Sequence, residues 1–333
     1  MSDTAVNQAA MNDAQATDLA PELESFRREL TGYSYRMLGS AFEADDAVQE
    51  TMLRAWRNLD GFAGRSSLRS WLYRIATNVC LDMIGDRKRR ARPMDLRPAQ
   101  SADTPLPPPI EEQAWIEPVP DGRVLSDGDP AEVALARESI KLAFMAALQH
   151  LPPNQRAVLI LREVLRWKAT EVAELLGTSV ASVNSALQRA RETLDSRAIS
   201  LDDPARPMDE ASSALLSRYV EAFETYDMDA LTALFQEDAT WNMPPYDLWL
   251  QTHADIAAWC LGTGSGCRGS RLLPISVNGS PGFAQYKPSA PGRLEPWSIQ
   301  VVELADGKIS GVTFFLDTQR FFPMFGLPAY LDA

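Results

Sequence analysis

The chain has 333 residues, of which 45% are hydrophobic and 23% charged, and its formal net charge is −13. This length suffices for about two domains with buried cores, and the composition excludes a wholly disordered chain, a collagen and a small disulfide scaffold. Because no run of about 18 apolar residues or signal-peptide pattern occurs, we expect a cytoplasmic protein without membrane contact. Three cysteines and two histidines argue against a disulfide framework and a zinc site.

The charge is unevenly distributed along the chain. Residues 62–92 contain eight basic and two acidic side chains, whereas 94–134 and 206–333 each carry seven excess acidic charges. A net acidic chain is usually a poor nucleic-acid binder, but the basic segment ends in the cluster Arg87-Lys88-Arg89-Arg90, which allows one. The alternative is that this cluster is only a solvated charge run.

Composition divides the chain into successive parts. Residues 1–21 predict a disordered tail, 22–93 a helical module, and 94–130 an acidic linker that is semi-extended at Pro107-Pro108-Pro109. A second helical module follows at 131–200 and a second linker at 201–208. The Gly- and Pro-punctuated segment 209–320 predicts an α+β domain, and residues 321–333 form an apolar tail.

Two amphipathic helices are predicted in the first module. In the first helix an apolar stripe faces the core, and an acidic and amide face lies beside it, which is either a wet surface or a docking site. The stripe consists of Val48, Met52, Trp56 and Leu59, and the polar face consists of Asp45, Asp46, Gln49 and Glu50.

The second helix of this module, within 68–84, has a core stripe that includes Cys80, which favours a core role for that cysteine over a nucleophilic one. Its opposite face is predicted to carry Ser70, Tyr73, Arg74, Thr77 and Leu81. An aromatic ring and an arginine one turn apart suit stacking on unpaired bases and pairing with phosphates, although an ordinary solvent face is the alternative.

Residues 170–194 predict a helix-turn-helix. Thr170 is the expected N-cap, Gly177 ends the first helix, and Thr178-Ser179 opens the second. In the second helix the inward positions are Val183, Leu187, Ala190 and Leu194, and the outward positions are Ser182, Ser185, Gln188 and Arg189. Hydrogen-bonding side chains on an outward face are typical of a recognition helix, and a purely structural hairpin is the alternative.

Within the α+β domain the sequence predicts two helices, at about 209–225 and 228–236, and a terminal hairpin around Asp306-Gly307. The residues of a candidate pocket are Trp241, Met243, Tyr246, Trp249 and Trp259, and the candidate acid–base groups are Asp247, His253 and Asp255. Because these groups form no ordered pair or triad, we predict no catalytic residue. An enzyme or a ligand-binding sensor in this domain is the alternative function.

These motifs resemble a known family. The segments FEADDAVQET (42–51) and WLYRIATN (71–78) resemble region 2 of bacterial sigma factors of the sigma-70 class, and LPPNQRAV (151–158) with the helix-turn-helix resembles region 4. Only a linker separates them, as in the extracytoplasmic-function group. Residues 209–320 resemble a SnoaL-like domain of the nuclear transport factor 2-like fold, and WIEP (115–118) resembles a linker motif of sigma factors with such an extension.

The resemblance implies two all-α modules, a region 2 bundle and a region 4 helix-turn-helix at 169–194, followed by a cone-shaped α+β domain. It implies no covalent chemistry, cofactor or metal. Its partners would be core RNA polymerase, through the clamp of the largest subunit and the flap, and promoter DNA, with a small-molecule ligand or a regulatory protein as further candidates.

The resemblance also assigns roles to residues. The face with Asp45, Asp46, Gln49 and Glu50 would bind the clamp. The −10 element would contact the loop Gly64–Leu68 and the residues Ser70, Tyr73, Arg74, Thr77, Asn78, Arg87, Lys88, Arg89 and Arg90. The −35 element would be read by Ser182, Ser185, Gln188 and Arg189, with Lys168 and Arg191 on phosphates.

The apolar chain end, 321–333, is expected to cover a surface on the sigma modules or the linker, since exposed apolar segments of this size are unfavourable in water. Through such docking the C-terminal domain would regulate the sigma modules. The alternative is that the tail completes the core of its own domain.

Overall fold

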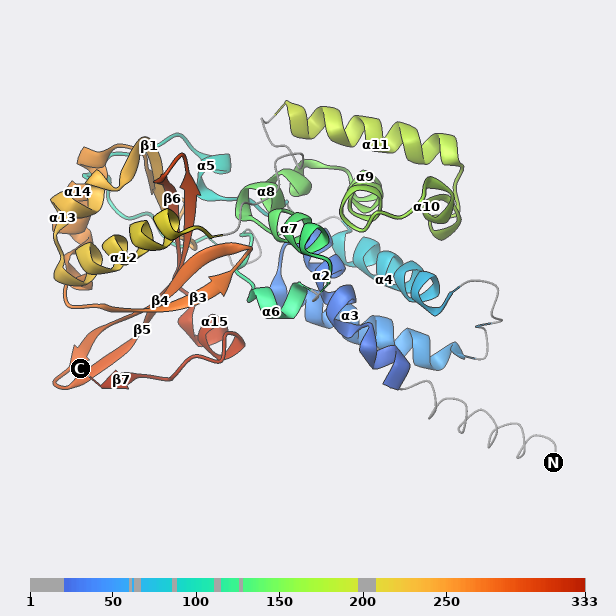
Figure 1. The fold of residues 1–333 in the computed structure, drawn as a ribbon, viewed down its shortest axis with the longest axis horizontal. Helices are drawn as coiled ribbons and strands as arrows, with labels where there is room; N and C mark the ends of the chain where they lie inside the picture. Colours follow the sequence, from blue (N-terminus) through green and yellow to red (C-terminus); the bar gives the residue numbers. More distant parts are fainter. Residues whose placement is uncertain are drawn as a thin grey trace. The chain divides into compact units, whose positions relative to one another are not determined.

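The computed structural model describes residues 21–59, 62, 67–85, 89–110, 115–125, 128–196 and 208–332. The chain divides into two compact units (Figure 1). The helical unit comprises Met1–Arg87, Arg123–Asp129 and Ala143–Asp202, and the sheet unit comprises Lys88–Gly122, Pro130–Leu142 and Asp203–Ala333. Among the described residues, no helix is both long and apolar enough to cross a bilayer.

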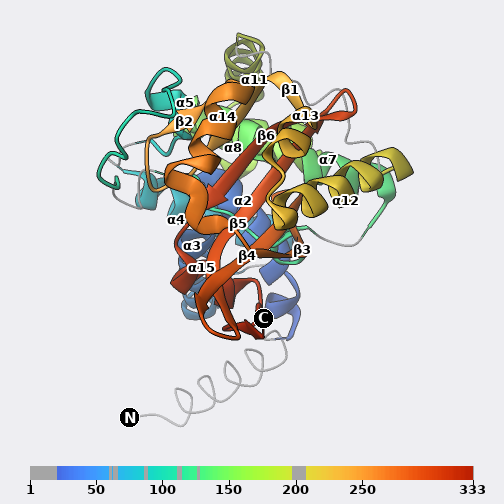
Figure 2. The same ribbon diagram turned by 90° about the vertical axis from the view of Figure 1, so that its left-hand side faces the viewer.

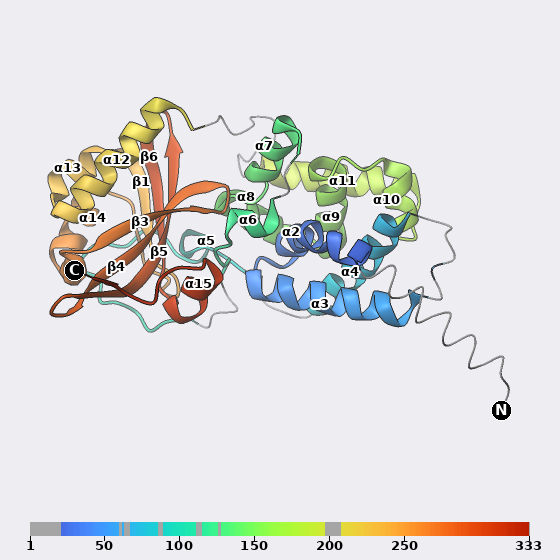
Figure 3. The same ribbon diagram turned by 60° about the horizontal axis from the view of Figure 1, so that its bottom comes forward.

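The helical unit contains most of both predicted helical modules. Its first part consists of α2 (Arg27–Leu38), α3 (Ala41–Arg57) and α4 (Leu68–Ile84). Its second part consists of most of α8 (Leu142–His150), α9 (Pro153–Leu159), the π-helical turn η3 (Ile160–Val164), α10 (Ala169–Leu175) and α11 (Val180–Asp195). Figure 3 shows α11 beside α9 and α10, and α2 beside α3.

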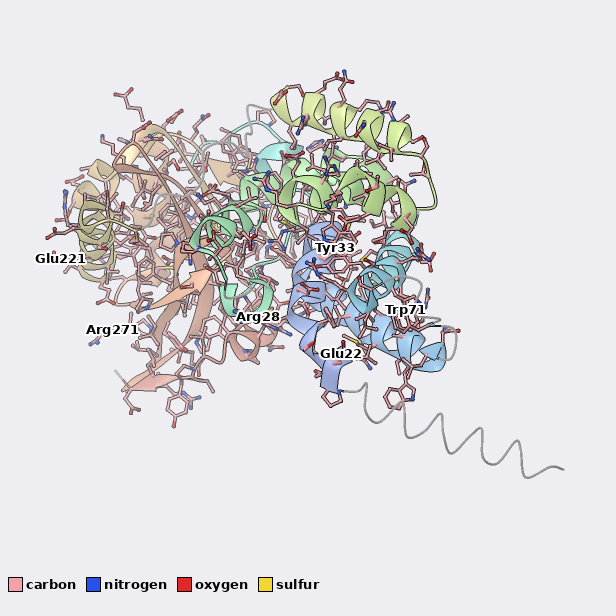
Figure 4. All side chains as sticks on the ribbon, turned by 45° about the vertical axis from the view of Figure 1, so that its right-hand side comes forward. Glu22, Arg28, Tyr33, Trp71, Glu221 and Arg271 are labelled. Atoms are coloured by element: carbon pink, nitrogen blue, oxygen red, sulfur yellow. The ribbon has the colours of Figure 1, made fainter. Side chains whose placement is uncertain are left out.

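Side-chain caps and a glycine set the limits of the first helices. The Ser40 side chain accepts a hydrogen bond from the Glu43 N–H at the start of α3, and Gly39, at φ 74°, ends α2 in the left-handed conformation. Tyr33, labelled in Figure 4, is fully buried among these helices and its hydroxyl lies 2.8 Å from that of Thr77. The predicted stripe of α3 holds at Val48, which is buried, but fails at Trp56, which is 48% exposed.

A buried arginine joins the two modules. Arg156 of α9 is 5% exposed and donates to the side chain of Gln149 (2.8 Å) and to the main-chain carbonyls of Leu151 and Met37. Met37 belongs to the C-terminal turn of α2, whose carbonyls have no partner within the helix. Arg156 therefore satisfies one of them, the Met37 carbonyl, and holds α9 against α2.

The sheet unit contains a strongly bent mixed sheet with helices on one side. The strands are β1 (Phe235–Asn242), β2 (Trp249–Leu250), β3 (Arg271–Val277), β4 (Ser280–Ala290), β5 (Arg293–Ala305), β6 (Lys308–Phe315) and β7 (Leu331–Asp332). Their order is β2-β1-β6-β5-β4-β3, β7 pairs with β5, and only β1 and β6 run parallel. In Figure 2, α12 (Glu210–Thr225), α13 (Met228–Ala233) and α14 (His253–Leu261) lie in front of the strands.

The C-terminal tail belongs to this unit. In α15 (Thr318–Met324) the side chains of Phe321 and Phe322 are buried, and the Phe322 ring meets Tyr286 of β4 edge-on at 5.2 Å. Leu331 pairs with Leu294 of β5. The tail thus completes the core and the sheet of its own domain, which was the alternative interpretation of the sequence. It also covers the linker, as predicted, because Phe321 lines one cavity together with Trp115 and Ile116.

The segment predicted as an acidic linker, 94–130, is also largely part of the sheet unit. It includes most of the short helix α5 (Pro93–Leu96), and Trp115 and Ile116 are buried. The helix α7 (Pro130–Glu138), at the start of the predicted second module, belongs to the sheet unit as well. A further short helix, α6 (Asp121–Val124), lies where the chain passes from one unit to the other. The expected boundaries at 94–130 and 131–200 therefore do not coincide with the compact units.

Candidate polymerase and nucleic-acid interfaces

The acidic face of α3 is partly free and partly paired. Asp46 and Gln49 are exposed. Asp45 accepts two hydrogen bonds, of 2.7 and 2.8 Å, from the Arg123 guanidinium, and Glu50 accepts one of 2.7 Å from Arg54. The four predicted residues thus share one side of the helix, but two of them already have cationic partners within the chain.

Two apolar side chains extend this face. Leu53 and Trp56 are 43% and 48% exposed, and they follow Gln49 by four and seven positions, so they continue its side of the helix. Trp56 was expected in the core, and Leu53 was not among the predicted residues. The spacing from Gln49 was the available signal, and a hydrophobic end to an acidic face suits a protein partner.

The predicted −10 surface of α4 needs correction at two residues. Tyr73 and Thr77 are fully buried, not exposed: the Tyr73 ring lies 5.2 Å from Tyr33 and 5.0 Å from Trp167, and burial raises the pKa of its hydroxyl. The side of α4 that carries Tyr73 is therefore covered, because Tyr33 of α2 and Trp167 pack on it. Tyr73 cannot stack on a base in this conformation.

The other α4 residues remain accessible to different degrees. Asn78 is exposed, Ser70 is half-buried with its hydroxyl 2.9 Å from that of Ser67, and Arg74 donates to the main-chain carbonyl of Glu174 in α10 (3.3 Å). Arg74 thus joins α4 to the helix-turn-helix.

The basic cluster is only partly exposed. Arg89 is exposed, but Arg90 is 6% exposed and donates to the Trp115 carbonyl (2.7 Å), so the prediction that Arg90 faces DNA is wrong for this conformation. A run of like charges does not reveal that one member has a main-chain partner 25 residues away. Arg87, Lys88 and most of the loop Gly64–Leu68 lie outside the described residues.

The helix-turn-helix agrees closely with its prediction. The four inward side chains of α11 are buried, and the outward set Ser182, Ser185, Gln188 and Arg189 is exposed. Gly177 takes φ +62°, and the Ser179 side chain caps α11 at the Ser182 N–H. The predicted N-cap is wrong by two residues: α10 begins at Ala169, where the Glu171 carboxylate accepts from the Lys168 N–H (2.7 Å).

Exposed polar chemistry lines the outward face of α11. Arg189 donates to the Ser185 hydroxyl (2.9 Å), and Gln188 donates to Glu192 (3.0 Å). Lys168 is exposed, whereas Arg191 forms an ion pair of 2.7 Å with Glu163. These weak exposed contacts can exchange for contacts with bases and phosphates at little cost.

The residues of the predicted pocket are core residues. Trp241 and Trp259 are about 5% exposed and belong to the hydrophobic core, and Met243 and Tyr246 pack against it. Trp249 is 8% exposed and its indole N–H donates to the Arg97 carbonyl (2.8 Å). All five therefore contribute packing or hold the linker.

The acid–base candidates contact main chain and linker. Asp247 forms an ion pair with Arg97, Asp255 accepts from the Ala102 N–H (3.0 Å), and the His253 ring lies 2.7 Å from the Gln236 carbonyl. Within the part of the chain that the structure describes, no three His, Cys, Asp or Glu side chains are grouped for a metal ion.

The helix-covered face of the sheet carries a buried, neutral hydrogen-bond network. The Tyr219 hydroxyl donates to Gln300 (2.8 Å), Gln300 donates to Gln285 (3.0 Å), and Gln285 donates to the Ser270 hydroxyl (3.0 Å). Each of these four residues is at most 1% exposed. The four members of this network are amides and hydroxyls that satisfy one another, and none of them is a carboxylate or a histidine that could transfer a proton.

Comparison with known proteins identifies the modules that carry these surfaces. Family models match for Sigma-70 region 2 over residues 23–90, Sigma-70 region 4 over 141–194 and a SnoaL-like domain over 216–312. The "ECF RNA polymerase sigma factor SigG" of Mycobacterium tuberculosis (strain ATCC 25618 / H37Rv) is 46% identical over 329 residues, which cover 95% of this chain and 85% of that protein. The corresponding SigJ is 27% identical over 319 residues, covering 90% and 92%.

A solved structure has the same arrangement of elements. The crystal structure of M. tuberculosis SigJ superposes with a TM-score of 0.58 at 23% identity, covering 93% of this chain and 99% of that one. The two helical modules and the mixed-sheet domain thus have the fold predicted from the sequence. The chain belongs to the extracytoplasmic-function RNA polymerase sigma factors and ends in a SnoaL-like domain.

Proposed function

We propose that this sigma factor divides its work among three surfaces. The exposed face of α11 reads the −35 element, α4 and the adjoining basic residues bind the −10 element, and the acidic face of α3 with Leu53 and Trp56 binds the polymerase clamp. The observation that carries the proposal is the outward face of α11, where four hydrogen-bonding side chains are exposed above a fully buried apolar stripe.

Two variants separate base reading from phosphate binding. Arg189→Ala in the reconstituted holoenzyme should relax the preference at one −35 position, since a bidentate base contact contributes about 1–3 kcal/mol. Lys168→Ala should weaken all promoters alike and reduce the slope of log K against log salt by about one unit. If Arg189→Ala weakened every sequence equally and Lys168→Ala changed the preference, the assignment of the two surfaces would be wrong.

The proposed reading of two elements requires α4 and α10 to separate. In this structure Arg74 of α4 contacts Glu174 of α10. The two promoter elements are centred about 25 base pairs apart, which is about 85 Å of duplex at 3.4 Å per base pair. One conformation with α4 against α10 cannot reach both. We therefore assign the structure to the free protein and expect polymerase to hold the two modules apart.

For the C-terminal domain we propose a binding role within the chain in place of catalysis. The supporting observation is that its candidate acid–base and pocket residues hold the linker: Asp247 holds Arg97, Asp255 holds the Ala102 N–H, and Trp249 holds the Arg97 carbonyl. The Trp249 carbonyl also accepts from the Gln100 N–H (3.0 Å). The linker thus occupies the polar groups that a substrate would need.

Transcription by full-length protein and by a chain that ends at Leu201 tests this role. If the domain regulates through the linker, the two proteins should differ in transcript yield, and Asp247→Asn with Asp255→Asn should shift the full-length protein toward the truncated one. An enzyme or small-molecule sensor predicts the opposite: those two substitutions would leave transcription unchanged while abolishing turnover or ligand binding.

A further inference from the structure

A close main-chain neighbour explains why a glycine stands at position 32, inside helix α2. A Cβ built on Gly32 would lie 2.5 Å from the main-chain oxygen of Val124, which is closer than real Cβ atoms approach. Gly32 lies in the middle of α2 and has no positive φ, so its backbone does not require glycine. Glycine destabilises a helix interior relative to alanine. The close approach of Val124 is therefore the structural use of Gly32.

The chain around Val124 is well anchored on the helical unit. Val124 and Leu125 are 4% and 5% exposed, and the preceding residue, Arg123, makes the two hydrogen bonds to Asp45. The Arg123 and Asp45 side chains are 37% and 38% exposed, so the pair lies at the surface beside Asp46. Arg123 thus covers one end of the acidic face of α3, while Val124 lies against α2, and we call residues 123–125 the linker lid.

We propose that the linker lid competes with core polymerase for the acidic face of α3 in the free protein. This inference rests on the proposed function of that face. Arg123 supplies a guanidinium, which is the chemistry that a basic polymerase surface would offer to the same carboxylate. The oxygens of Asp45 that Arg123 occupies are not available to a second cation with the same geometry. Polymerase therefore binds the fraction of molecules in which the lid has left, and the apparent affinity falls by that fraction.

Two substitutions release the lid in different ways, and a third is a matched control. Gly32→Ala places a methyl group where the Val124 carbonyl lies, while it favours the helix itself. Arg123→Ala removes the ion pair and leaves the Gly32 contact intact. Gly122→Ala is the control, because a Cβ there meets nothing within 4 Å although it lies in the same short helix as Val124.

The experiment measures the dissociation constant of the full-length protein for purified core polymerase, and the rate of tryptic cleavage after Arg123 in the free protein. Arg123→Ala should bind polymerase about two- to fivefold more tightly, as expected for loss of a partly exposed ion pair. Gly32→Ala should bind more tightly than Arg123→Ala, because it also loses the burial of Val124 and Leu125, and its cleavage should be faster. Gly122→Ala should match the parent in both measurements.

Equal polymerase affinity for the parent, Gly32→Ala and Arg123→Ala would refute the proposal that the linker lid competes with polymerase. If circular dichroism shows that Gly32→Ala has lost helix, the polymerase affinity of Arg123→Ala alone tests the lid proposal. The double variant Asp46→Lys with Glu50→Lys distinguishes failure of the lid proposal from failure of the proposed polymerase-binding face. If this double variant loses polymerase binding and the lid variants have no effect, only the lid is refuted. If the double variant binds like the parent, the proposed polymerase face is wrong, and the lid with it.

Discussion

The turn between β3 and β4 offers a sharp test of how the C-terminal domain holds the linker. Asn278 is fully buried: its main-chain N–H and side-chain oxygen both bond Val119, at 3.1 and 3.0 Å, and its side-chain NH₂ donates to the Ile140 carbonyl at 2.9 Å. The Gly279 N–H donates to the Asp121 carboxylate at 2.7 Å. Gly279 takes φ +67°, and a Cβ there would lie well under 3.0 Å from the Arg137 carbonyl oxygen.

Gly279→Ala should therefore detach this turn from the linker. A non-glycine residue in the left-handed conformation costs about 1–2 kcal/mol by itself. The methyl group also forces the turn away from Arg137, which breaks a bond to a carboxylate, about 1.5–3 kcal/mol, and one neutral bond, about 0.5–1.5 kcal/mol. Gly307→Ala is the matched control, since Gly307 takes φ +73° but its Cβ would meet nothing within 4 Å. Gly307→Ala should lose only the free energy of holding a non-glycine residue in the left-handed conformation.

Hydrogen exchange at the Val119 amide measures the difference. Loss of about 2–4 kcal/mol of docking should accelerate exchange there by about 30- to 700-fold in Gly279→Ala relative to Gly307→Ala. Both variants should lose a similar, smaller amount of stability in their own hairpins. Equal protection of Val119 in the two variants would show that the turn does not hold the linker.

Three further predictions concern other residues. Asp121→Asn keeps an oxygen that can accept from the Gly279 N–H, and it removes a charge whose burial raises the pKa of Asp121. Hydrogen exchange at the Val119 amide should therefore stay slow in Asp121→Asn, whereas Asp121→Ala should accelerate it. Arg191→Ala should reduce the salt dependence of promoter binding without altering the preferred sequence, and a changed preference would contradict its phosphate role. Burial raises the pKa of the Cys80 thiol to about 12 from a usual value of 9.0, so its stabilising contribution is complete below pH 9 and is lost as the pH rises toward 12. Urea titrations between pH 8 and 11 should show that loss in the parent and a weaker one in Cys80→Ala.

The sequence predicted the helix-turn-helix well because local rules determine it. Val183, Leu187, Ala190 and Leu194 repeat with the period of a helix, and Gly177 supplies the left-handed turn that joins the two helices. Exposure of the outward residues then follows directly, since one apolar stripe leaves the opposite face in water.

The sequence was less informative where a helix packs on two sides. Tyr73 was expected to face solvent because it lies off the main stripe of α4, but Trp167, almost a hundred residues later, covers it. Trp56 was misplaced for the opposite reason: it continues the spacing of Val48 yet is 48% exposed, and periodicity does not reveal where packing partners end.

The linker could not be predicted from its composition. Acidic and proline-rich segments are usually extended and solvated, whereas this one buries apolar side chains such as Trp115 and Ile116. Its attachment depends on main-chain hydrogen bonds to particular partners, such as the Gln100 N–H to the Trp249 carbonyl and the Ile110 N–H to the Pro245 carbonyl. Such contacts have no sequence signal, because every residue except proline carries the same donor.

Mapping of transcript start sites with purified core polymerase and fragmented genomic DNA tests the central claim most directly. Discrete start sites should appear only when this chain is added. They should disappear when four residues of α11 are replaced by alanine together, while the variant still binds core polymerase; these are Ser182, Ser185, Gln188 and Arg189. Unchanged start sites with the substituted α11, or none with the parent protein, would contradict promoter recognition by this surface.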